Sequence, residues 1–514
     1  MERTLEVACE GTASSFAVRK LSRATLFPEA ARRLPYDVSL QPEAGSPFRR
    51  PTTGGHGLAL NGQGASSLPT LAPGPHRSIP AARYADVCGQ RRKRDELVTM
   101  RRVPAGRHQD RGRQPAQRLR SRGGALGEST PASSFRPDFP HPGVRSHADR
   151  LVLWLTRACN LRCKYCFARN MNADPKCMAS DTARRALELL LPPRRPVTIA
   201  FFGGEPLLEW DLLTEVVEFA KHAYNGPGRP GFEATTNGTL LDADKAAFLD
   251  REGFELIVSL DGPEDIHNRW RPGPAGVDSY EATLNGLRVL KGRRLATRTT
   301  LRGTFTAQDL RLRARLEHHH RLIDEGLAAH VAIEPASPFA PAAEDWGAVE
   351  AEYEQAARFL RDRIRQGRRA SLESLVRFVR RLAFRQAVFH ECEAGNGTVS
   401  VAPDGAIYAC HREGPSAIGN LAAGGLDEAL RAPWLDNRFY LDAKCLECPI
   451  RLACGGPCRQ DALAQGAMHV PEEAGCRLRH IQFRWAAWLL SELTREEAAR
   501  LAGLRASTCC GQRT

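Results

Sequence analysis

Long apolar runs are missing from this sequence of 514 residues. No stretch of 18 or more apolar residues occurs in it, and its start, MERTLEVACEG, holds no apolar core of a secretory signal. The first absence predicts a protein without a transmembrane helix, and the second predicts a cytoplasmic protein. An excess of one charge is also missing over most of the chain, because residues 149–514 hold 49 Lys and Arg against 47 Asp and Glu. This near-neutral balance argues against nucleic acid as the partner.

Residues 1–148 lack a persistent apolar period of 2 or 3.6 residues and are rich in Gly, Pro, Ser and Arg. They hold 24 Lys and Arg against 12 Asp and Glu, so most of the net charge of +14 lies here. Apolar content this sparse does not offset the entropy that an ordered chain loses. We therefore expect a disordered, low-complexity basic segment or an over-long start of the chain. A basic arm for RNA or for an acidic peptide is the functional alternative.

Cysteine, in contrast, is abundant, with 15 residues. In a long chain without a secretory signal, clustered cysteines indicate metal binding rather than a disulfide framework. The first cluster, Cys159, Cys163 and Cys166, lies in TRACNLRCKYCFARN directly after the apolar run of residues 151–155. Three thiolates in this C-x3-C-x2-C spacing can hold three irons of a cubane cluster and leave the fourth iron open. Zinc is the alternative, although structural zinc sites usually take four protein ligands.

Apolar, β-rich runs alternate with segments of helical spacing around and after this cluster. The strand-like runs are 151–155, 197–206, 232–238, 254–263, 297–306 and 330–338, and the helical segments are 182–191, 212–224, 243–252 and 280–292. Such alternation predicts an α/β fold with a parallel sheet, whose chemistry lies at the carboxyl ends of the strands. Three of these runs end in turn-like residues. They are Gly203, Gly204, Glu205 and Pro206 in the first, Thr236 and Asn237 in the second, and Ser259 and Asp261 in the third. Ordinary turn chemistry is the alternative explanation of these residues.

A second set of cysteines follows in the C-terminal part of the chain. Its seven members are Cys392, Cys410, Cys445, Cys448, Cys454, Cys458 and Cys476. The central four have the spacing C-x2-C-x5-C-x3-C, and zinc knuckles are the alternative to iron–sulfur clusters here. Five cysteines remain outside both sets, and we expect no catalytic role for them: Cys9, Cys88, Cys177, Cys509 and Cys510.

On the C-x3-C-x2-C motif, the GGEP segment and the seven later cysteines, the chain resembles radical S-adenosylmethionine (SAM) enzymes with a C-terminal SPASM domain. The similarity is to the peptide maturases of that group, with thioether-forming maturases and anaerobic sulfatase maturases as relatives. It implies a partial (β/α)6 barrel of the TIM type followed by a Cys-rich domain. We expect a radical SAM core at 149–340, a helical bridging region at 341–386, a SPASM domain at 387–480, and a C-terminal helix and tail at 481–514.

The resemblance also implies cofactors and their ligands. Cys159, Cys163 and Cys166 are expected to hold a 4Fe-4S cluster whose open iron binds SAM. The GGEP residues would bind the SAM ammonium group, Ser259 and Asp261 would lie near its ribose, Thr236 and Asn237 would line the same mouth, and Arg298 or Arg302 would meet its carboxylate. Two auxiliary 4Fe-4S clusters are expected, one on Cys445, Cys448, Cys454 and Cys476 and one on Cys392, Cys410 and Cys458. The last iron of the second would be open or bound by Glu391, Glu393 or a substrate thiolate.

The implied reaction is the cross-linking of a ribosomally made peptide. Reductive SAM cleavage gives a 5′-deoxyadenosyl radical, which abstracts hydrogen and leads to a thioether or carbon–carbon bond. Sulfatase maturases place Asp after the cysteine equivalent to Cys410, whereas this chain has His411 there. His411 and Arg412 are therefore candidates to position or deprotonate substrate, or equally to support the cluster.

Several alternatives stay open. Formylglycine formation or another peptide oxidation, a non-peptide substrate, and a non-enzymatic iron–sulfur electron carrier are all compatible with parts of the pattern. Further expected partners are a one-electron donor of the flavodoxin or ferredoxin type and a separate leader-peptide recognition protein, because no winged domain is recognisable before residue 149. Helical spacing is also visible at 344–386 and 480–503, which we expect to be bridging and packing helices.

Overall fold

The computed structural model describes residues 145, 147–168, 176–192, 195–224, 229–274, 277–389, 391–412, 416–436, 442–456, 458–466 and 468–502. Most of the segment 1–148, which the sequence predicts to be disordered, and the tail cysteines Cys509 and Cys510 therefore lie outside the described residues. Within the described part, no helix combines the length and the apolar character that crossing a membrane requires.

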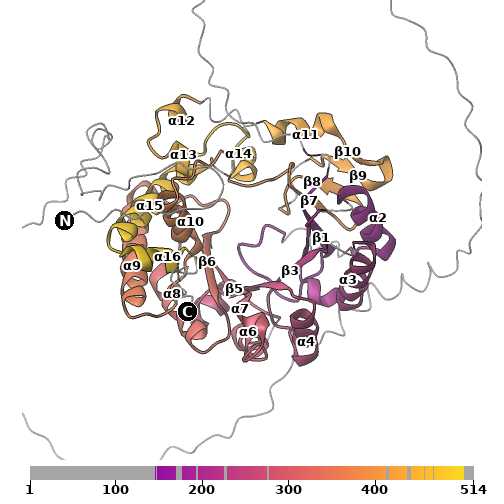
Figure 1. The fold of residues 1–514 in the computed structure, drawn as a ribbon, viewed down its shortest axis with the longest axis horizontal. Coiled ribbons are helices and arrows are strands. Elements are labelled where there is room, and N and C mark those ends of the chain that lie inside the picture. The colour runs from indigo at the N-terminus through magenta and orange to yellow at the C-terminus, as the bar shows by residue number, and fades with distance from the viewer. Residues whose placement is uncertain are drawn as a thin grey trace, which may run out of the picture. The chain divides into compact units, whose positions relative to one another are not determined.

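Six parallel strands form the central sheet in the order of the chain, which confirms the predicted α/β fold with a parallel sheet (Figure 1). The strands are β1 (Arg150–Thr156), β2 (Thr198–Gly203), β3 (Gly231–Thr236), β4 (Glu255–Ser259), β5 (Thr299–Phe305) and β6 (His330–Pro335). Figure 1 shows them curving around a central space with the helices outside. This arrangement is the partial barrel that the resemblance implies.

The two faces of β1 show why the sheet has an inside and an outside. Because side chains alternate along a strand, Leu151, Leu153 and Leu155 pack into the large core beneath the outer helices. Val152 and Trp154 face the other way and form a small separate cluster with Ala168, Ala200 and Phe202. The first cysteine loop packs on this inner cluster through Cys166.

Helices follow the strands and cover the outer face. They are α2 (Ser180–Leu190), α3 (Trp210–Ala223), α4 (Ala243–Arg251), α5 (Glu264–Trp270), α6 (Ser279–Arg288), α7 (Arg294–Thr297) and α8 (Leu312–Asp324), with a short 3-10 turn η3 (Pro206–Glu209) before α3. Side-chain caps fix where two of them begin, since Asp242 accepts from the Lys245 amide and Asp278 from the Glu281 amide. The sequence therefore sets these helix starts locally.

The region predicted to bridge the two cysteine sets is helical. A 3-10 turn η4 (Ala343–Asp345) leads into α9 (Trp346–Arg365), which is followed by α10 (Glu373–Ala383). The predicted last helix 480–503 is two helices, α15 (Glu473–Ser491) and α16 (Arg495–Leu501). The break has a local cause, because Thr494 and Glu497 form a capping box that begins a new helix.

The C-terminal region does not have a sheet of its own. Strands β7 (Thr398–Val401), β8 (Ala406–Tyr408), β9 (Gly419–Asn420) and β10 (Gly425–Leu426) continue the barrel sheet to ten strands in the described residues. β7 pairs in parallel with β1, with Leu151 opposite Val399. The remaining helices are α11 (Glu428–Leu435), α12 (Ala443–Glu447), α13 (Arg451–Cys454) and α14 (Arg459–Ala464). This shared sheet joins the segment that carries Cys410 to the strand that precedes the first cysteine loop.

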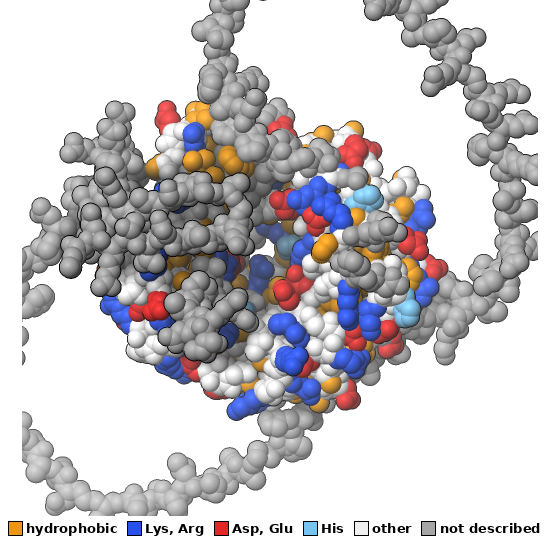
Figure 2. Space-filling view, viewed as in Figure 1, with side chains coloured by type: hydrophobic (Ala, Val, Ile, Leu, Met, Phe, Trp, Pro, Cys, Tyr) orange, Lys and Arg blue, Asp and Glu red, His pale blue; other side chains and the backbone are white. Residues whose placement is uncertain are grey.

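Charges are mixed on the surface of this unit. In the view of Figure 2, basic and acidic side chains are interspersed over the barrel, and neither sign covers a broad area. The picture agrees with the near-neutral balance of residues 149–514.

Candidate active site

The first three cysteines lie in the loop that leaves the carboxyl end of β1. Two backbone hydrogen bonds hold the loop against the end of α5, from Arg162 to Pro272 and from Lys164 to Trp270, both 2.9 Å. Burial, and then the carboxylate of Glu205, raise the pKa of the Cys159 thiol, and its neighbours Cys163 and Cys166 raise it further. These thiols thus lie close enough to disfavour one another's charge, as expected for groups that a cationic cluster neutralises.

The glycines of the GGEP segment allow a close backbone approach. A Cβ on Gly203 would lie 2.3 Å from the carbonyl oxygen of Thr156, and one on Gly204 would lie 2.1 Å from that of Ala158. Amides of the segment donate to the same carbonyls, from Gly204 to Thr156 and from Glu205 to Ala158, both at 2.9 Å. Only glycine fits here, and the consequence is that the end of β2 lies directly on the start of the cysteine loop.

Glu205 is a fully buried carboxylate at this junction. It accepts hydrogen bonds from the Thr236 hydroxyl at 2.7 Å, the Asn237 amide at 2.7 Å and the Leu207 amide at 3.1 Å. Burial raises the pKa of Glu205 to about 7, although these hydrogen bonds act in the opposite direction. The structure therefore brings together four of the residues expected to contact SAM, since Pro206 follows Glu205 as the first residue of η3.

Asn160, which the sequence did not single out, connects this group to the cysteine loop. Its side-chain oxygen accepts from the Asn237 amide group at 2.8 Å, and its own amide group donates to Thr239 at 2.8 Å. Asn160 is buried next to Cys159. Its place inside the cysteine motif is the only signal that sequence reasoning had for it.

Asp261, which is expected near the SAM ribose, has three hydrogen-bond partners within the protein. Its carboxylate accepts from the Tyr165 hydroxyl at 2.6 Å, from Arg271 Nε at 2.9 Å and from the Thr304 amide at 3.0 Å, and it is fully buried. Arg271 in turn lies 3.9 Å from the sulfur of Cys163. Asp261 thus connects Tyr165 of the cysteine loop to Arg271 at the end of α5, a role that no local pattern revealed.

Of the two arginines considered for the SAM carboxylate, only one lies at the right end of its strand. Arg298 donates to the Phe254 carbonyl and to Asp250, at the amino end of β5. Arg302 lies opposite Ser259 in the register of β5 and β4, near the carboxyl end of β4. Ser259 is partly exposed and Arg302 is exposed. The structure therefore removes Arg298 from the site.

The seven later cysteines fall into two groups in the described residues. Burial, then Cys454, Cys445 and Cys448, raise the pKa of the Cys476 thiol to about 12. Burial, with a contribution from Cys392, also raises the pKa of Cys410, and burial and Asp461 raise that of Cys458 to about 12, again with a contribution from Cys392. These two sets have the same members as the four-cysteine and three-cysteine sets named above.

In the part of the chain that the structure describes, no three His, Cys, Asp or Glu side chains are grouped tightly enough to share one metal ion. The later thiols are grouped by their electrostatic influence on one another and by the partners that they share.

Glu391 and Glu393 are the two carboxylates considered as ligands of the last iron of the three-cysteine set. Glu391 accepts from Arg377 at 2.7 Å, from Arg381 at 2.8 Å and from Arg479 at 2.8 Å, and its amide donates to Gly455. Its carboxylate is thus bound by three arginines, one of which donates to the carbonyl oxygen of Cys454.

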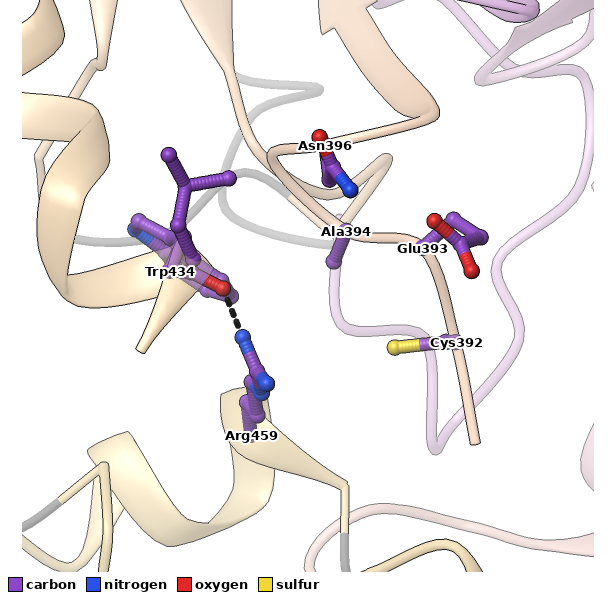
Figure 3. A pocket seen from close by; sticks show the side chains of 7 residues that line it. Cys392, Glu393, Ala394, Asn396, Trp434 and Arg459 are labelled. Atoms are coloured by element: carbon purple, nitrogen blue, oxygen red, sulfur yellow. Dashed lines mark hydrogen bonds between the residues drawn. The ribbon is translucent and has the colours of Figure 1, made fainter. Parts of the chain in front are cut away.

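Glu393 borders a small recess together with Cys392. The recess is lined by Cys392, Glu393, Ala394, Asn396, Trp434, Leu435 and Arg459. Figure 3 shows the sulfur of Cys392 pointing across it toward Arg459, whose guanidinium donates to the Trp434 carbonyl, while the Glu393 side chain is directed away from that sulfur. Whether Glu393 ligates the last iron of the three-cysteine set stays a prediction.

His411 lies on the barrel side of the second set. The indole nitrogen of Trp154 donates to the His411 carbonyl oxygen at 3.0 Å. The imidazole contacts Phe202 edge to face at 5.0 Å between ring centroids and Phe167 at 6.2 Å. Burial, and then the charge of Arg302, lower the pKa of His411 to about 3, so the ring is neutral. Since Phe167 follows Cys166 and His411 follows Cys410, one aromatic cluster connects the two cysteine sets.

Arg412 points the other way, toward the later cysteines. Its guanidinium Nη1 lies 3.5 Å from the Cys458 sulfur, and its backbone amide lies 3.5 Å from the Cys410 sulfur. The guanidinium also donates to Asp461 at 2.7 Å and to the Ser337 hydroxyl. Of the two interpretations of Arg412, its contacts are those of a residue that supports the cluster thiols.

Part of the chain matches a known protein family. Residues 155–312 match the family model described as Radical SAM superfamily. The chain is 30% identical over 149 residues to the cysteine-type anaerobic sulfatase-maturating enzyme of Clostridium perfringens (strain ATCC 13124), covering 27% of this chain and 40% of that protein. It is 33% identical over 141 residues to the Fe-coproporphyrin III synthase of Methanosarcina barkeri, covering 27% and 33%.

A solved structure is similar in fold over a longer part of the chain. It is that of native anSMEcpe with bound AdoMet and Kp18Cys peptide, with a TM-score of 0.56, 18% identity, and coverage of 66% of this chain and 98% of that one. The chain spans between about a third and a half of the length of the curated relatives that it matches. The family model covers the first cysteine set and ends before the second.

Proposed function

We propose that this chain, whose residues 155–312 form a radical SAM domain, is an enzyme that binds SAM and three iron–sulfur clusters and oxidatively cross-links a ribosomally made peptide. The observation that carries the proposal is the contact of His411 with Phe167 and Phe202 at the barrel mouth. It joins the SAM-cluster loop to the auxiliary cysteines, so that a substrate held between them would meet both. An isolated electron carrier has no need of a second set at this position.

The residues present fit a SAM-bound 4Fe-4S cluster. Three thiols that disfavour one another's charge lie beside the fully buried carboxylate of Glu205. Gly203 and Gly204 lie so close to the start of the cysteine loop that no side chain would fit there. Cys159, Cys163 and Cys166 would hold the cluster, and Glu205 with Gly203 and Gly204 would hold the SAM ammonium group. When bound, the reduced cluster supplies one electron to SAM, which gives methionine and a 5′-deoxyadenosyl radical that removes hydrogen from the peptide.

The chain's own residues complete the site. Ser259 and Arg302 face the interior of the barrel, and Arg302 offers a charge to the SAM carboxylate. His411 is neutral, because its pKa is lowered to about 3, so its ring can position substrate by hydrogen bonding or packing rather than by charge. The overall balance is then a peptide that loses two hydrogens while SAM becomes methionine and 5′-deoxyadenosine with release of one proton. The electron needed to cleave SAM would be balanced by the one that the substrate loses, for which a cluster held by the later cysteines would be the acceptor.

The nature of the substrate rests on two supports. The sulfatase-maturating relative acts on a protein, as its name says, and the similar solved structure contains a peptide. His411, where sulfatase maturases have Asp, favours cross-linking over formylglycine formation. The Fe-coproporphyrin III synthase relative keeps a non-peptide substrate as the second candidate. An external one-electron donor and a separate leader-peptide recognition protein belong to this proposal as partners.

The test is a mass spectrum of short peptides encoded beside the gene, after anaerobic co-expression with the enzyme. We expect a loss of two hydrogens per site, which a Cys159→Ala, Cys163→Ala, Cys166→Ala variant does not produce. Fragmentation then locates the bond. A Cys or Ser converted to an aldehyde would favour formylglycine formation, and unchanged peptides with a modified porphyrin would overturn the choice of substrate.

A further inference from the structure

Each of the three cysteine sets has an arginine–carboxylate pair nearby, and two of these pairs place the arginine beside a sulfur. Beside the first set, Arg271 pairs with Asp261 at 2.9 Å and lies 3.9 Å from the Cys163 sulfur. Beside the four-cysteine set, Arg479 pairs with Glu391 at 2.8 Å, and Glu391 also accepts from Arg381, which donates to the carbonyl oxygen of Cys454 at 3.4 Å. Beside the three-cysteine set, Arg412 pairs with Asp461 at 2.7 Å.

The three arginines differ in how directly they reach sulfur. Arg412 has two donors within 3.5 Å of two different sulfurs, its Nη1 at Cys458 and its backbone amide at Cys410. The guanidinium of Arg271 stands further off, at 3.9 Å from one sulfur. Hydrogen bonds and positive charge at cluster sulfurs stabilise the more negative, reduced state and so raise the reduction potential. The gradation of contacts therefore predicts a gradation of potentials.

We propose that Arg412 raises the reduction potential of the cluster on Cys392, Cys410 and Cys458 above those of the other two clusters, and so makes that cluster the acceptor of the substrate electron. The inference rests on the proposed function, because it requires that the three sets hold clusters. In the redox step that it concerns, the substrate radical loses one electron and the cluster gains one. Arg412 is thus a positioning and tuning residue that does not touch substrate.

The surroundings of Arg412 hold its charge and its direction. Although burial acts against its charge, the hydrogen bond to Asp461 raises the pKa of Arg412. The Ser337 hydroxyl, which the guanidinium also contacts, lies in the loop after β6 and donates to the same Asp461. Because β6 belongs to the barrel, this network ties the auxiliary set to the rim of the SAM domain.

Potentiometric titration followed by electron paramagnetic resonance tests the proposal on the fully reconstituted enzyme. SAM addition identifies the signal of the SAM cluster, and a Cys454→Ala variant identifies that of the four-cysteine cluster. In Arg412→Gln we expect the ratio of reduced to oxidised three-cysteine cluster at a fixed potential to fall about tenfold, which is ~59 mV for one electron. The other two signals should stay where they are.

Three further variants make the test independent of folding or loading. Arg412→Lys keeps the charge but loses the planar fork, so its potential should lie between those of the wild type and Arg412→Gln. Ser337→Ala removes one anchor without changing any charge and should give a smaller shift in the same direction. The matched control Arg479→Gln removes the same charge beside Cys454 and should lower the potential of the four-cysteine cluster alone.

Two kinds of failure are distinguishable. Unshifted potentials in loaded Arg412→Gln or Arg412→Lys, or a shift of the SAM cluster instead, would overturn the role of Arg412 and leave the proposed function standing. Iron and sulfide analysis of the wild-type enzyme that accounts for no cluster on the later cysteines would overturn the proposed function itself.

Discussion

Trp154 and His411 are 257 positions apart in the chain, yet the indole nitrogen of the first donates a hydrogen bond of 3.0 Å to the carbonyl oxygen of the second. Trp154 is fully buried on the inner face of β1, and His411 follows a cysteine of the second set. Both rings contact Phe202, which makes the packing between them continuous. This pair fixes where the later cysteines lie relative to the barrel.

The first prediction concerns that bond. Trp154→Phe keeps an aromatic ring but leaves the His411 carbonyl without its donor, which we expect to lower the free energy of unfolding by about 1–3 kcal/mol. A displaced His411 should also lower the amount of modified peptide formed per 5′-deoxyadenosine. Both are measured, by chemical unfolding and by product ratios. Trp485→Phe is the matched control, because the buried indole nitrogen of Trp485 has no hydrogen-bond partner among the described residues. Equal effects of the two variants would contradict the account.

The second prediction concerns Gly204, one of the two glycines that let the end of β2 lie on the cysteine loop. A Cβ on Gly204 would lie 2.1 Å from the Ala158 carbonyl oxygen, so Gly204→Ala must push β2 away from the cysteine loop. We expect a destabilisation of about 1–3 kcal/mol and a loss of iron from the first cysteine set. Gly347→Ala, at a helical position with nothing within 4 Å, is the control and should be neutral or slightly stabilising. Full iron content in Gly204→Ala would contradict the placement of the cluster.

The third prediction concerns the pH dependence of SAM binding. The pKa of Glu205 is raised to about 7 by burial, and an ammonium group binds its charged form. At pH 6 about one tenth of a group with this pKa is ionised and at pH 8 about nine tenths, so SAM should bind roughly tenfold more weakly at pH 6. Calorimetric titration at the two values measures this. Glu205→Gln should bind SAM weakly at both, and a variant that keeps the wild-type dependence would exclude Glu205 as its source.

The fourth prediction concerns three consecutive histidines on α8. Burial lowers the pKa of His318 and of His320 to about 4 and lowers that of His319 as well. Their ordinary pKa is about 6.5, so the unfolded chain takes up protons first, and the stability that they contribute above pH 6.5 is lost as the pH falls toward 4. At pH 5.5 each of His318 and His320 should cost about 1.4 kcal/mol.

Unfolding by urea between pH 7.5 and 5.5 measures the slope of stability with pH. We expect His318→Gln to be less stable than the wild type at pH 7.5 but to lose less stability on acidification, since one titrating group has gone. His222→Gln, on an exposed histidine of α3, is the control and should keep the wild-type slope. An unchanged slope in His318→Gln would assign the acid sensitivity to other groups.

Much of the fold was predictable because its signals are local. Apolar runs ending in turn residues predicted all six barrel strands, the spacing of the first three cysteines predicted one set, and the resemblance implied the division of the later cysteines. Caps such as Asp242 and Asp278 begin helices through contacts within four residues. Such features depend on neighbours in the chain and are therefore visible in the sequence.

The parts that sequence reasoning missed depend on long-range contacts. The partners of Asp261 come from the cysteine loop, α5 and β5, so its expected place at the SAM ribose could not be distinguished from its anchoring of Tyr165 and Arg271. Glu391 was open as an iron ligand until its three arginine partners were known. The addition of β7 to the barrel sheet beside β1 likewise joins residues almost 250 positions apart, and no local pattern announces it.

The central claim is that this chain abstracts hydrogen from a peptide with a radical made from SAM. The most direct measurement uses a peptide encoded beside the gene and deuterated at its side-chain carbons, incubated anaerobically with the reconstituted enzyme, SAM and a one-electron reductant. The account predicts one deuterium in 5′-deoxyadenosine and a peptide that has lost two hydrogens, neither of them with the Cys159→Ala, Cys163→Ala, Cys166→Ala variant. Unlabelled 5′-deoxyadenosine together with an unchanged peptide would contradict it.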